Sequence, residues 1–321
     1  MSHRPTTTSP SFPNGETPAL RALAEHLTAI ADADGLAHLI LYDRGTVRIA
    51  VAAGDPDDAD DHARNGRQLY FTLGELGPDL AQLRSGVLMR TIIQVPTGAI
   101  FFFLVGGDVH LYGATQHAEH TDELDRLMAR AANGIRRDWR YSELDFGSYL
   151  SVARNDGAAA GAPGPPAATA PDDRPGGADA EPDGGPLAPL AGALSATGLH
   201  HVAYHQPGRA EVVTADVFDD PALEEFFAFL SRDERRAQYR ILGERLPGLA
   251  NWLNTALWAV TGGEAIRLVL DVELGALYLF ALPDNRYLVG VTLDQTLVEV
   301  ADRAMQRLTA ELTRRLGPAP R

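Results

Sequence analysis

Apolar residues recur along the first part of the chain at two spacings, one typical of helices and one typical of strands. Two runs with the pattern of strands lie at 38–42 and 46–52, and the Asp43-Arg44-Gly45 turn between them predicts a hairpin. A helix is predicted before them, starting at the N-cap pair Thr17-Pro18, because apolar residues follow three or four positions apart: Leu20, Leu23, Leu27 and Ile30.

The next stretch predicts a second helix, three more strands and a closing helix. The second helix carries Leu76, Leu80 and Leu83 and is expected to end at Ser85-Gly86. Strands are predicted at 88–95, 99–105 and 109–115, and the nearly continuous apolar run of the middle one is typical of a central strand. The closing helix has one apolar stripe, formed by Leu124, Leu127, Met128, Ala131 and Ile135.

The resulting order, α-β-β-α-β-β-β-α, occurs twice in the chain. Residues 76–137 align without a gap with residues 253–314, and sixteen of the 62 aligned positions are identical. Further upstream, the stretch from Gly35 matches the stretch from Gly198, and the second copy carries extra residues around Asp219–Leu246. This pattern indicates a tandem duplication. The identical pairs are Leu76/Leu253, Leu80/Leu257, Gly86/Gly263, Arg90/Arg267, Val95/Val272, Gly98/Gly275, Ala99/Ala276, Phe103/Phe280, Leu111/Leu288, Gly113/Gly290, Thr115/Thr292, Asp125/Asp302, Arg126/Arg303, Met128/Met305, Arg130/Arg307 and Arg137/Arg314.

Two segments lack the composition of a folded core. Residues 1–16 are polar and rich in Pro, Ser and Thr, and residues 154–186 consist almost wholly of Gly, Ala, Pro and Asp. The first predicts a disordered tail, and the second predicts a disordered linker that spans roughly 30 Å. They delimit two domains at 17–153 and 187–316. The fold class predicted for each domain is α/β, a layered structure with a mostly antiparallel five-stranded sheet.

Composition excludes several classes of chemistry. The chain contains no cysteine and no lysine. Disulfides, thiol nucleophiles, cysteine-based metal sites, Schiff bases and the phosphate-loop lysine are therefore excluded. A formal net charge of −15 argues against nucleic acid and anionic membrane as partners. No apolar run reaches the length of a membrane helix and no secretory leader is recognisable, so a cytoplasmic location is expected.

Three clusters of potential metal ligands are better explained without a metal. His117 and His120 fall in a loop or helix start, and His201 and His205 lie on a predicted strand, where their spacing corresponds to about 13 Å. Asp55–Asp61 crowds carboxylates but lacks the ligand pattern of a calcium-binding loop. No known catalytic motif is recognisable, so no catalytic, cofactor-binding or metal-binding residue is assigned.

Two arginines and one aromatic segment are the remaining candidates for partner binding. Arg90 and Arg267 occupy the same third-strand position in the two copies. They either contact an acidic partner or phosphate, or act as edge-strand charges that discourage aggregation. The aromatic-rich segment Asp138–Leu150 either packs back on the core or presents a motif to a partner. His38 and His201 are also equivalent, which predicts a shared, half-buried role.

The element order, the block 87–115 and the closing helix 122–137 resemble a Roadblock/dynein light-chain domain. The resemblance is clearest over Gln68–Arg137 and Gly248–Arg314. It implies a non-enzymatic domain that pairs through its second helix and third strand into a dimer with a continuous sheet. It also implies binding or regulation of small Ras-like GTPases, or a role as a scaffold. Pro78, inside the second helix of the first copy, and the insertion in the second copy depart from the family at this pairing surface.

We therefore expect two Roadblock-like domains that act as a non-enzymatic regulator or scaffold for a small Ras-like GTPase. The two copies would pair within one chain as a pseudo-dimer, or each would pair with its counterpart in a homodimer. Two other classes of function stay open, a small-molecule sensor in a signalling pathway and a structural self-assembly module. Any effect on GTP hydrolysis would rearrange the partner's own residues.

Overall fold

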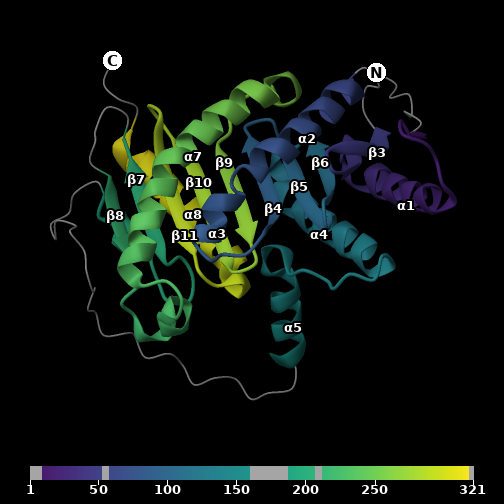
Figure 1. Ribbon diagram of the computed structural model, residues 1–321. Helices are drawn as coiled ribbons and strands as arrows, with labels where there is room; N and C mark the ends of the chain where they lie inside the picture. The colour runs from purple at the N-terminus through teal and green to yellow at the C-terminus, as the bar shows by residue number, and fades with distance from the viewer. Residues whose placement is uncertain (1–8, 53–57, 160–186, 207–211, 318–321) are drawn as a thin grey trace. The chain divides into compact units, whose positions relative to one another are not determined.

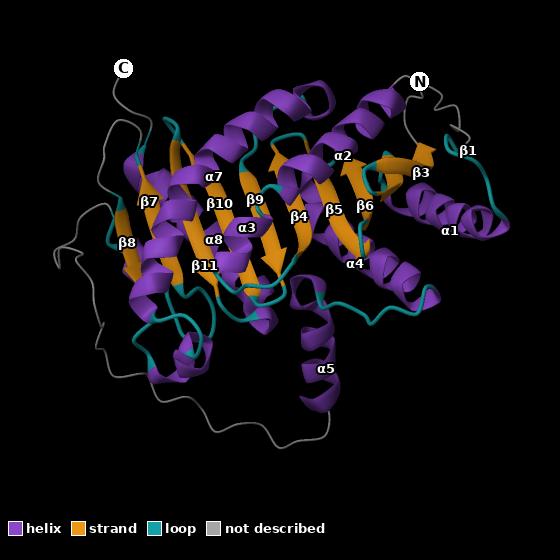
Figure 2. Ribbon diagram, viewed as in Figure 1, coloured by secondary structure: helices purple, strands orange, loops and turns teal. Residues whose placement is uncertain are grey.

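The computed structural model describes residues 9–52, 58–159, 187–206 and 212–317 as an α/β structure (Figures 1 and 2). The strands are β1 (Ser9–Ser11), β2 (His38–Asp43), β3 (Thr46–Ala52), β4 (Leu88–Val95), β5 (Gly98–Gly106), β6 (Val109–Thr115), β7 (His201–His205), β8 (Val213–Asp216), β9 (Arg267–Val272), β10 (Gly275–Leu282) and β11 (Arg286–Thr292). The helices are α1 (Pro18–Asp34), α2 (Ala59–Gly74), α3 (Gly77–Gln82), α4 (Thr121–Asp138), α5 (Tyr149–Ala159), α6 (Pro189–Gly192), α7 (Arg232–Thr261) and α8 (Val298–Leu316).

The sheet differs from the predicted pair of five-stranded sheets. It has 11 strands, in the order β1-β3-β2-β6-β5-β4-β9-β10-β11-β7-β8. β4 and β9, which the sequence would place at the edges of two sheets, are neighbours in this order. An edge strand exposes unpaired N–H and C=O groups, and a neighbouring strand satisfies them. β1 adds one strand to the ten that were predicted. Part of the predicted tail 1–16 is therefore not irregular, because β1 pairs with β3.

The chain forms two compact units, and each contains segments of both sequence copies. Unit 1 comprises Met1–Asp79, Leu88–Leu144 and Gly248–Leu270, and unit 2 comprises Leu80–Val87, Asp145–Pro247 and Asp271–Arg321. The exchange is reciprocal, because Gly248–Leu270 includes the repeat counterpart of Leu80–Val87. These units differ from the sequence copies 17–153 and 187–316, whose independence as domains stays a prediction.

Unit 1 is built around the antiparallel strands β3-β2-β6-β5-β4. β5 is buried at every position except the half-buried Leu104, which confirms the prediction of a central strand. α2 lies on one face of these strands, and α1 and α4 lie on the other (Figure 1). Thr17 caps α1 as predicted: its hydroxyl oxygen accepts a hydrogen bond from the backbone N–H of Leu20 at 3.2 Å.

Unit 2 is built around the antiparallel strands β10-β11-β7-β8. The first half of α7 lies on one face and α8 on the other (Figure 2). The extra residues of the second copy form a 3₁₀ helix, Pro221–Phe227, and the first turns of α7. Arg236 of α7 fixes this insertion to the end of β8, because its guanidinium donates to Asp216 and Asp219 at 2.8 Å each.

A glycine in the fifth strand of each copy lets the closing helix approach the sheet. A Cβ atom at Gly113 would lie 2.8 Å from Sδ of Met128 in α4. At the equivalent Gly290, a Cβ atom would overlap Met305 of α8. Both methionines are fully buried. In both copies, therefore, the missing side chain permits close packing of a helix against the strand.

Three helices differ from the sequence predictions. The second helix predicted for the first copy corresponds to the short α3, which ends at Gln82, and α2 before it was not predicted. Pro78 lacks the N–H that a helix continuous from α2 would require there. The first helix of the second copy is only the four-residue α6. Residues 154–159 of the predicted linker continue α5, and residues 160–186 lie outside the described residues. Within the described ranges, no helix has both the length and the hydrophobicity to cross a membrane.

Candidate interaction site

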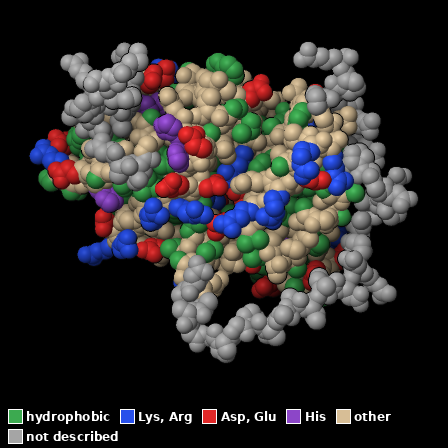
Figure 3. All heavy atoms as spheres, turned by 180° about the vertical axis from the view of Figure 1, so that it is seen from behind, with side chains coloured by type: hydrophobic (Ala, Val, Ile, Leu, Met, Phe, Trp, Pro, Cys, Tyr) green, Lys and Arg blue, Asp and Glu red, His purple; other side chains and the backbone are tan. Residues whose placement is uncertain are grey.

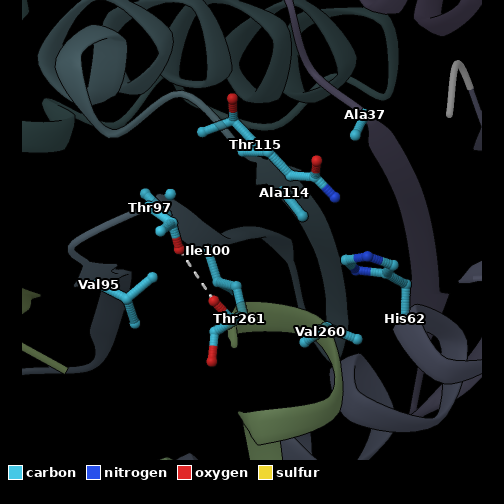
Figure 4. A pocket seen from close by; sticks show the side chains of 12 residues that line it. Ala37, His62, Val95, Thr97, Ile100, Ala114, Thr115, Val260 and Thr261 are labelled. Carbon is cyan, nitrogen blue, oxygen red and sulfur yellow. Dashed lines mark hydrogen bonds between the residues drawn. The ribbon is translucent and has the colours of Figure 1, made fainter. Parts of the chain in front are cut away.

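The C-terminal half of α7 is held firmly on unit 1. Leu253 and Leu257, one turn apart on this half of the helix, are buried. At its end, Thr97 Oγ1 of the β4–β5 turn donates a hydrogen bond to the carbonyl oxygen of Thr261 at 3.1 Å (Figure 4). Because its inner face is buried and its end is hydrogen-bonded, this part of α7 is a fixed support for the side chains on its outer face.

The outer face of this half-helix exposes two tryptophans. Trp252 is 36% exposed and Trp258 is 56% exposed. Ile266, shortly after the helix, is 40% exposed. Tryptophan is enriched among the residues that dominate binding energy at protein interfaces. We define Trp252 and Trp258 as the aromatic face of α7.

Sequence reasoning missed the aromatic face. The available signal was the position of Trp252 and Trp258 beside the stripe of Leu253 and Leu257 rather than within it. The repeat also contains a signal, because the first copy has Glu75 and Ala81 at the equivalent positions. The second copy therefore has an aromatic surface that duplication alone does not explain.

A small cavity lies in unit 1 where the end of α7 meets the strands. Its volume is about 20 Å³, and its lining includes Thr97, Thr115, Val260, Thr261 and His62. Figure 4 shows Thr97 and Thr261 facing each other, with the imidazole of His62 across from them. This volume suits a single water molecule and is far below that of sites that enclose small organic ligands. The cavity therefore gives no support to a small-molecule sensor.

The imidazole beside this cavity belongs to a buried polar cluster. His62 Nδ1 lies 2.7 Å from the hydroxyl oxygen of Tyr112, and the His62 ring stacks on His38 with 3.8 Å between ring centroids. Burial lowers the pKa of His62 to about 3 and also lowers the pKa of His38. Both rings are therefore neutral at neutral pH. His38 and its counterpart His201 are fully buried, not half-buried as predicted.

Arg90 and Arg267 lie in the interior rather than at an exposed edge. Arg90 is 3% exposed and forms an ion pair with Asp125 of α4. Arg267 is 6% exposed and donates to Asp122 at 3.0 Å and to the side-chain oxygen of Gln94 at 3.1 Å. The edge-charge interpretation is wrong, because β4 and β9 are not edge strands. Partner binding by Arg90 and Arg267 stays a prediction.

The histidine and aspartate clusters do not converge on a metal site. The rings of His117 and His120 are 6.1 Å apart and largely exposed. His201 and His205 lie on β7, where burial lowers the pKa of both. Of the segment Asp55–Asp61, the first three residues lie outside the described residues and the remainder leads into α2. No group of three or more potential ligands within the described ranges could hold a metal ion.

The aromatic segment Asp138–Leu150 is exposed in its first half and packs back on the protein in its second half. Asn133 of α4 exchanges two hydrogen bonds with the backbone of Leu144, at 2.8 and 2.9 Å. From Asp145 onward the segment belongs to unit 2, where Phe146 is buried and the N–H of Gly147 donates to Asp271 at 2.7 Å. The part from Asp145 therefore contributes to the core of unit 2, whereas Trp139 and Tyr141 are exposed.

Comparison with known proteins gives little further information. No family model matches the chain, and no curated protein matches it. Among solved structures, the chain is similar to a Roadblock/LC7 domain from Streptomyces avermitilis, with 19% sequence identity and a TM-score of 0.30. That match covers 39% of this chain and 99% of the other. Likeness at this level assigns neither a family nor a function.

Proposed function

We propose that the chain is a non-enzymatic cytoplasmic regulator or scaffold that binds a small Ras-like GTPase through paired Roadblock-like domains. The aromatic face of α7 is the observation that supports it most directly. Trp252 and Trp258 project from a helix whose opposite side is anchored in unit 1, and rigid aromatic side chains are typical anchors of protein interfaces. The class of partner comes from the resemblance of 68–137 and 248–314 to Roadblock domains.

The two copies, in this proposal, pair within one chain as a pseudo-dimer. The reciprocal composition of the units supports it: Leu80–Val87 belongs to unit 2, and Gly248–Leu270 belongs to unit 1. In a homodimer, a second chain would have to supply such segments. Because only the second copy has the two tryptophans, the pseudo-dimer would bind one GTPase through α7 rather than two.

Affinity capture with the full chain tests the proposal. The wild type and the variant Trp252→Ala/Trp258→Ala are immobilised and exposed to lysate of the source organism, supplemented with GDP or a non-hydrolysable GTP analogue. Proteins retained by each are identified by mass spectrometry. Phe229→Ala is a matched control, because Phe229 is 89% exposed and lies outside α7.

We expect the wild type and Phe229→Ala to retain a Ras-like GTPase in one nucleotide state. The double tryptophan variant should retain at least tenfold less, which corresponds to a loss of about 1.4 kcal/mol or more of binding free energy. Recovery of no GTPase in either nucleotide state would contradict the proposed partner. Equal recovery by the double variant would contradict the proposed site.

A further inference from the structure

The residues shared by the two copies fall into two groups in the structure. Of the sixteen identical pairs, twelve are buried in both copies and one, Gly86/Gly263, is half-buried in both. The core explains these thirteen pairs. The remaining three pairs are exposed in both copies, and all of them are arginines: Arg126/Arg303, Arg130/Arg307 and Arg137/Arg314.

These arginines form one row on each closing helix. Positions i, i+4 and i+11 of a helix lie within about 40° of one another around the axis, so each set of three shares one face. A rise of about 1.5 Å per residue places the second and third arginines about 6 and about 17 Å from the first along the axis. Figure 3 shows arginine side chains gathered on the surface that it views.

Local structure accounts for only part of each row. Arg303 pairs with Glu299 one turn earlier, and Arg137 pairs with Glu143 at 3.1 Å. Arg137 and its counterpart also lie in the last turns, where a cation interacts favourably with the helix dipole. Arg130 and Arg307 lie in mid-helix, and neither forms a hydrogen bond or ion pair with any described residue. Folding gives no reason for both copies to have arginine at this position.

We propose that the arginine rows of α4 and α8 are two corresponding binding surfaces for an acidic polypeptide segment of a partner protein. Each row presents guanidinium groups along a line, which complements carboxylates that repeat on one face of a helix. The chain as a whole carries a net charge of −15. Its long-range field therefore repels extended polyanions such as nucleic acid and anionic membrane more strongly than a short acidic segment that contacts the row alone.

The two rows are not equal in charge. In α8, Glu311 lies between the second and third arginines and pairs with Arg314 and Arg315. At the equivalent position α4 has Gly134, which leaves its row without that carboxylate. The row on α4 is therefore the tighter of the two binding surfaces.

Binding of a defined peptide tests this proposal. The probe is a fluorescein-labelled, alanine-based helical peptide with glutamates at positions i, i+4 and i+11, and the matched peptide has glutamine at those positions. Anisotropy titrations of the full chain compare the wild type with Arg130→Glu, Arg307→Glu and the double variant. The control Arg67→Glu/Arg240→Glu makes the same change in net charge at exposed arginines of α2 and α7. Circular dichroism verifies that each variant is folded.

We expect the glutamate peptide to saturate two sites on the wild type, and each single variant to lose one of them. The double variant should bind at least tenfold more weakly, and raising the salt from about 50 to about 200 mM should weaken wild-type binding. The control variant should bind much like the wild type. No binding of the glutamate peptide, equal binding of the glutamine peptide, or an equal loss in the control would each overturn the proposal. Phosphatidylserine vesicles or single-stranded DNA bound in preference to the peptide would also overturn it.

Discussion

Three histidines with lowered pKa values predict how this protein responds to acid. Burial lowers the pKa of His62 to about 3, that of His110 to about 4 and that of His201 to about 4. In the unfolded chain these side chains have ordinary pKa values near 6.5. Between these values the unfolded state binds more protons than the folded state, so stability must fall as the pH falls.

We expect the free energy of unfolding to be highest above about pH 6.5 and to decrease toward about pH 4, by on the order of 1.4 kcal/mol per pH unit for each such histidine. Denaturant titrations at several pH values measure this directly. His62→Gln should reduce the slope, since one depressed imidazole is removed. A flat profile between about pH 7 and about pH 5 would contradict neutral burial of these rings.

Gly98 is required by a close approach of two backbones. A Cβ atom there would overlap the backbone carbonyl oxygen of Thr115, which cannot move without disturbing the β5–β6 pairing. Gly98→Ala should lower the free energy of unfolding by about 1–3 kcal/mol. The matched control is Gly248→Ala in α7, where a Cβ atom meets nothing within 4 Å. It should be neutral or stabilising by up to about 1 kcal/mol in the same denaturant titration. Equal losses in the two variants would contradict the role of Gly98.

At the scale of single residues, the roles of glycines are easier to predict from the sequence than the roles of charged residues. Gly113 and Gly290 recur inside an apolar strand pattern, so their packing role could be predicted. The burial of Arg90 could not, because its partner Asp125 lies on another element. An arginine in a strand is ordinarily exposed, and only the tertiary structure shows the buried carboxylate that pairs with it.

At the scale of elements, the buried ion pair of Arg90 and Asp125 connects β4 to α4. Arg90→Met leaves the carboxylate of Asp125 buried without this partner and should lower the free energy of unfolding by about 3–5 kcal/mol. Arg90→Met/Asp125→Leu removes both charges and should be less destabilised than the single variant. Thermal and denaturant unfolding of Arg90→Met, Asp125→Leu and the double variant measure the difference. A double variant whose loss equals the sum of two independent losses would contradict direct pairing.

The strands and the closing helices could be predicted because their apolar periodicity is clear and glycines mark the turns. The bounds of the helices between the second and third strands of each copy could not be predicted. Pro78 lies at the start of α3, just after the break that separates it from α2, whereas Pro247 lies inside the 30-residue α7. Proline weakens a helix in both places, and only the packing of α7 in both units shows which helix continues through it. For the same reason the aromatic face of α7 was not predicted.

For the whole molecule, the exchange of Leu80–Val87 and Gly248–Leu270 makes each unit depend on both copies. A protease site inserted between residues 160 and 186 should therefore be cleavable without separating the halves. We expect the two fragments to co-elute in gel filtration under native conditions and to separate only in denaturant. Fragments that elute apart as folded proteins would contradict this dependence.

The solution mass of the intact chain tests the pseudo-dimer most directly. Light scattering coupled to gel filtration, over a wide range of protein concentration, gives this mass without any assumption about shape. If each copy finds its partner in the same chain, the mass stays at 34.5 kDa at every concentration. A mass of twice that value would show that the copies pair between chains and would contradict the account.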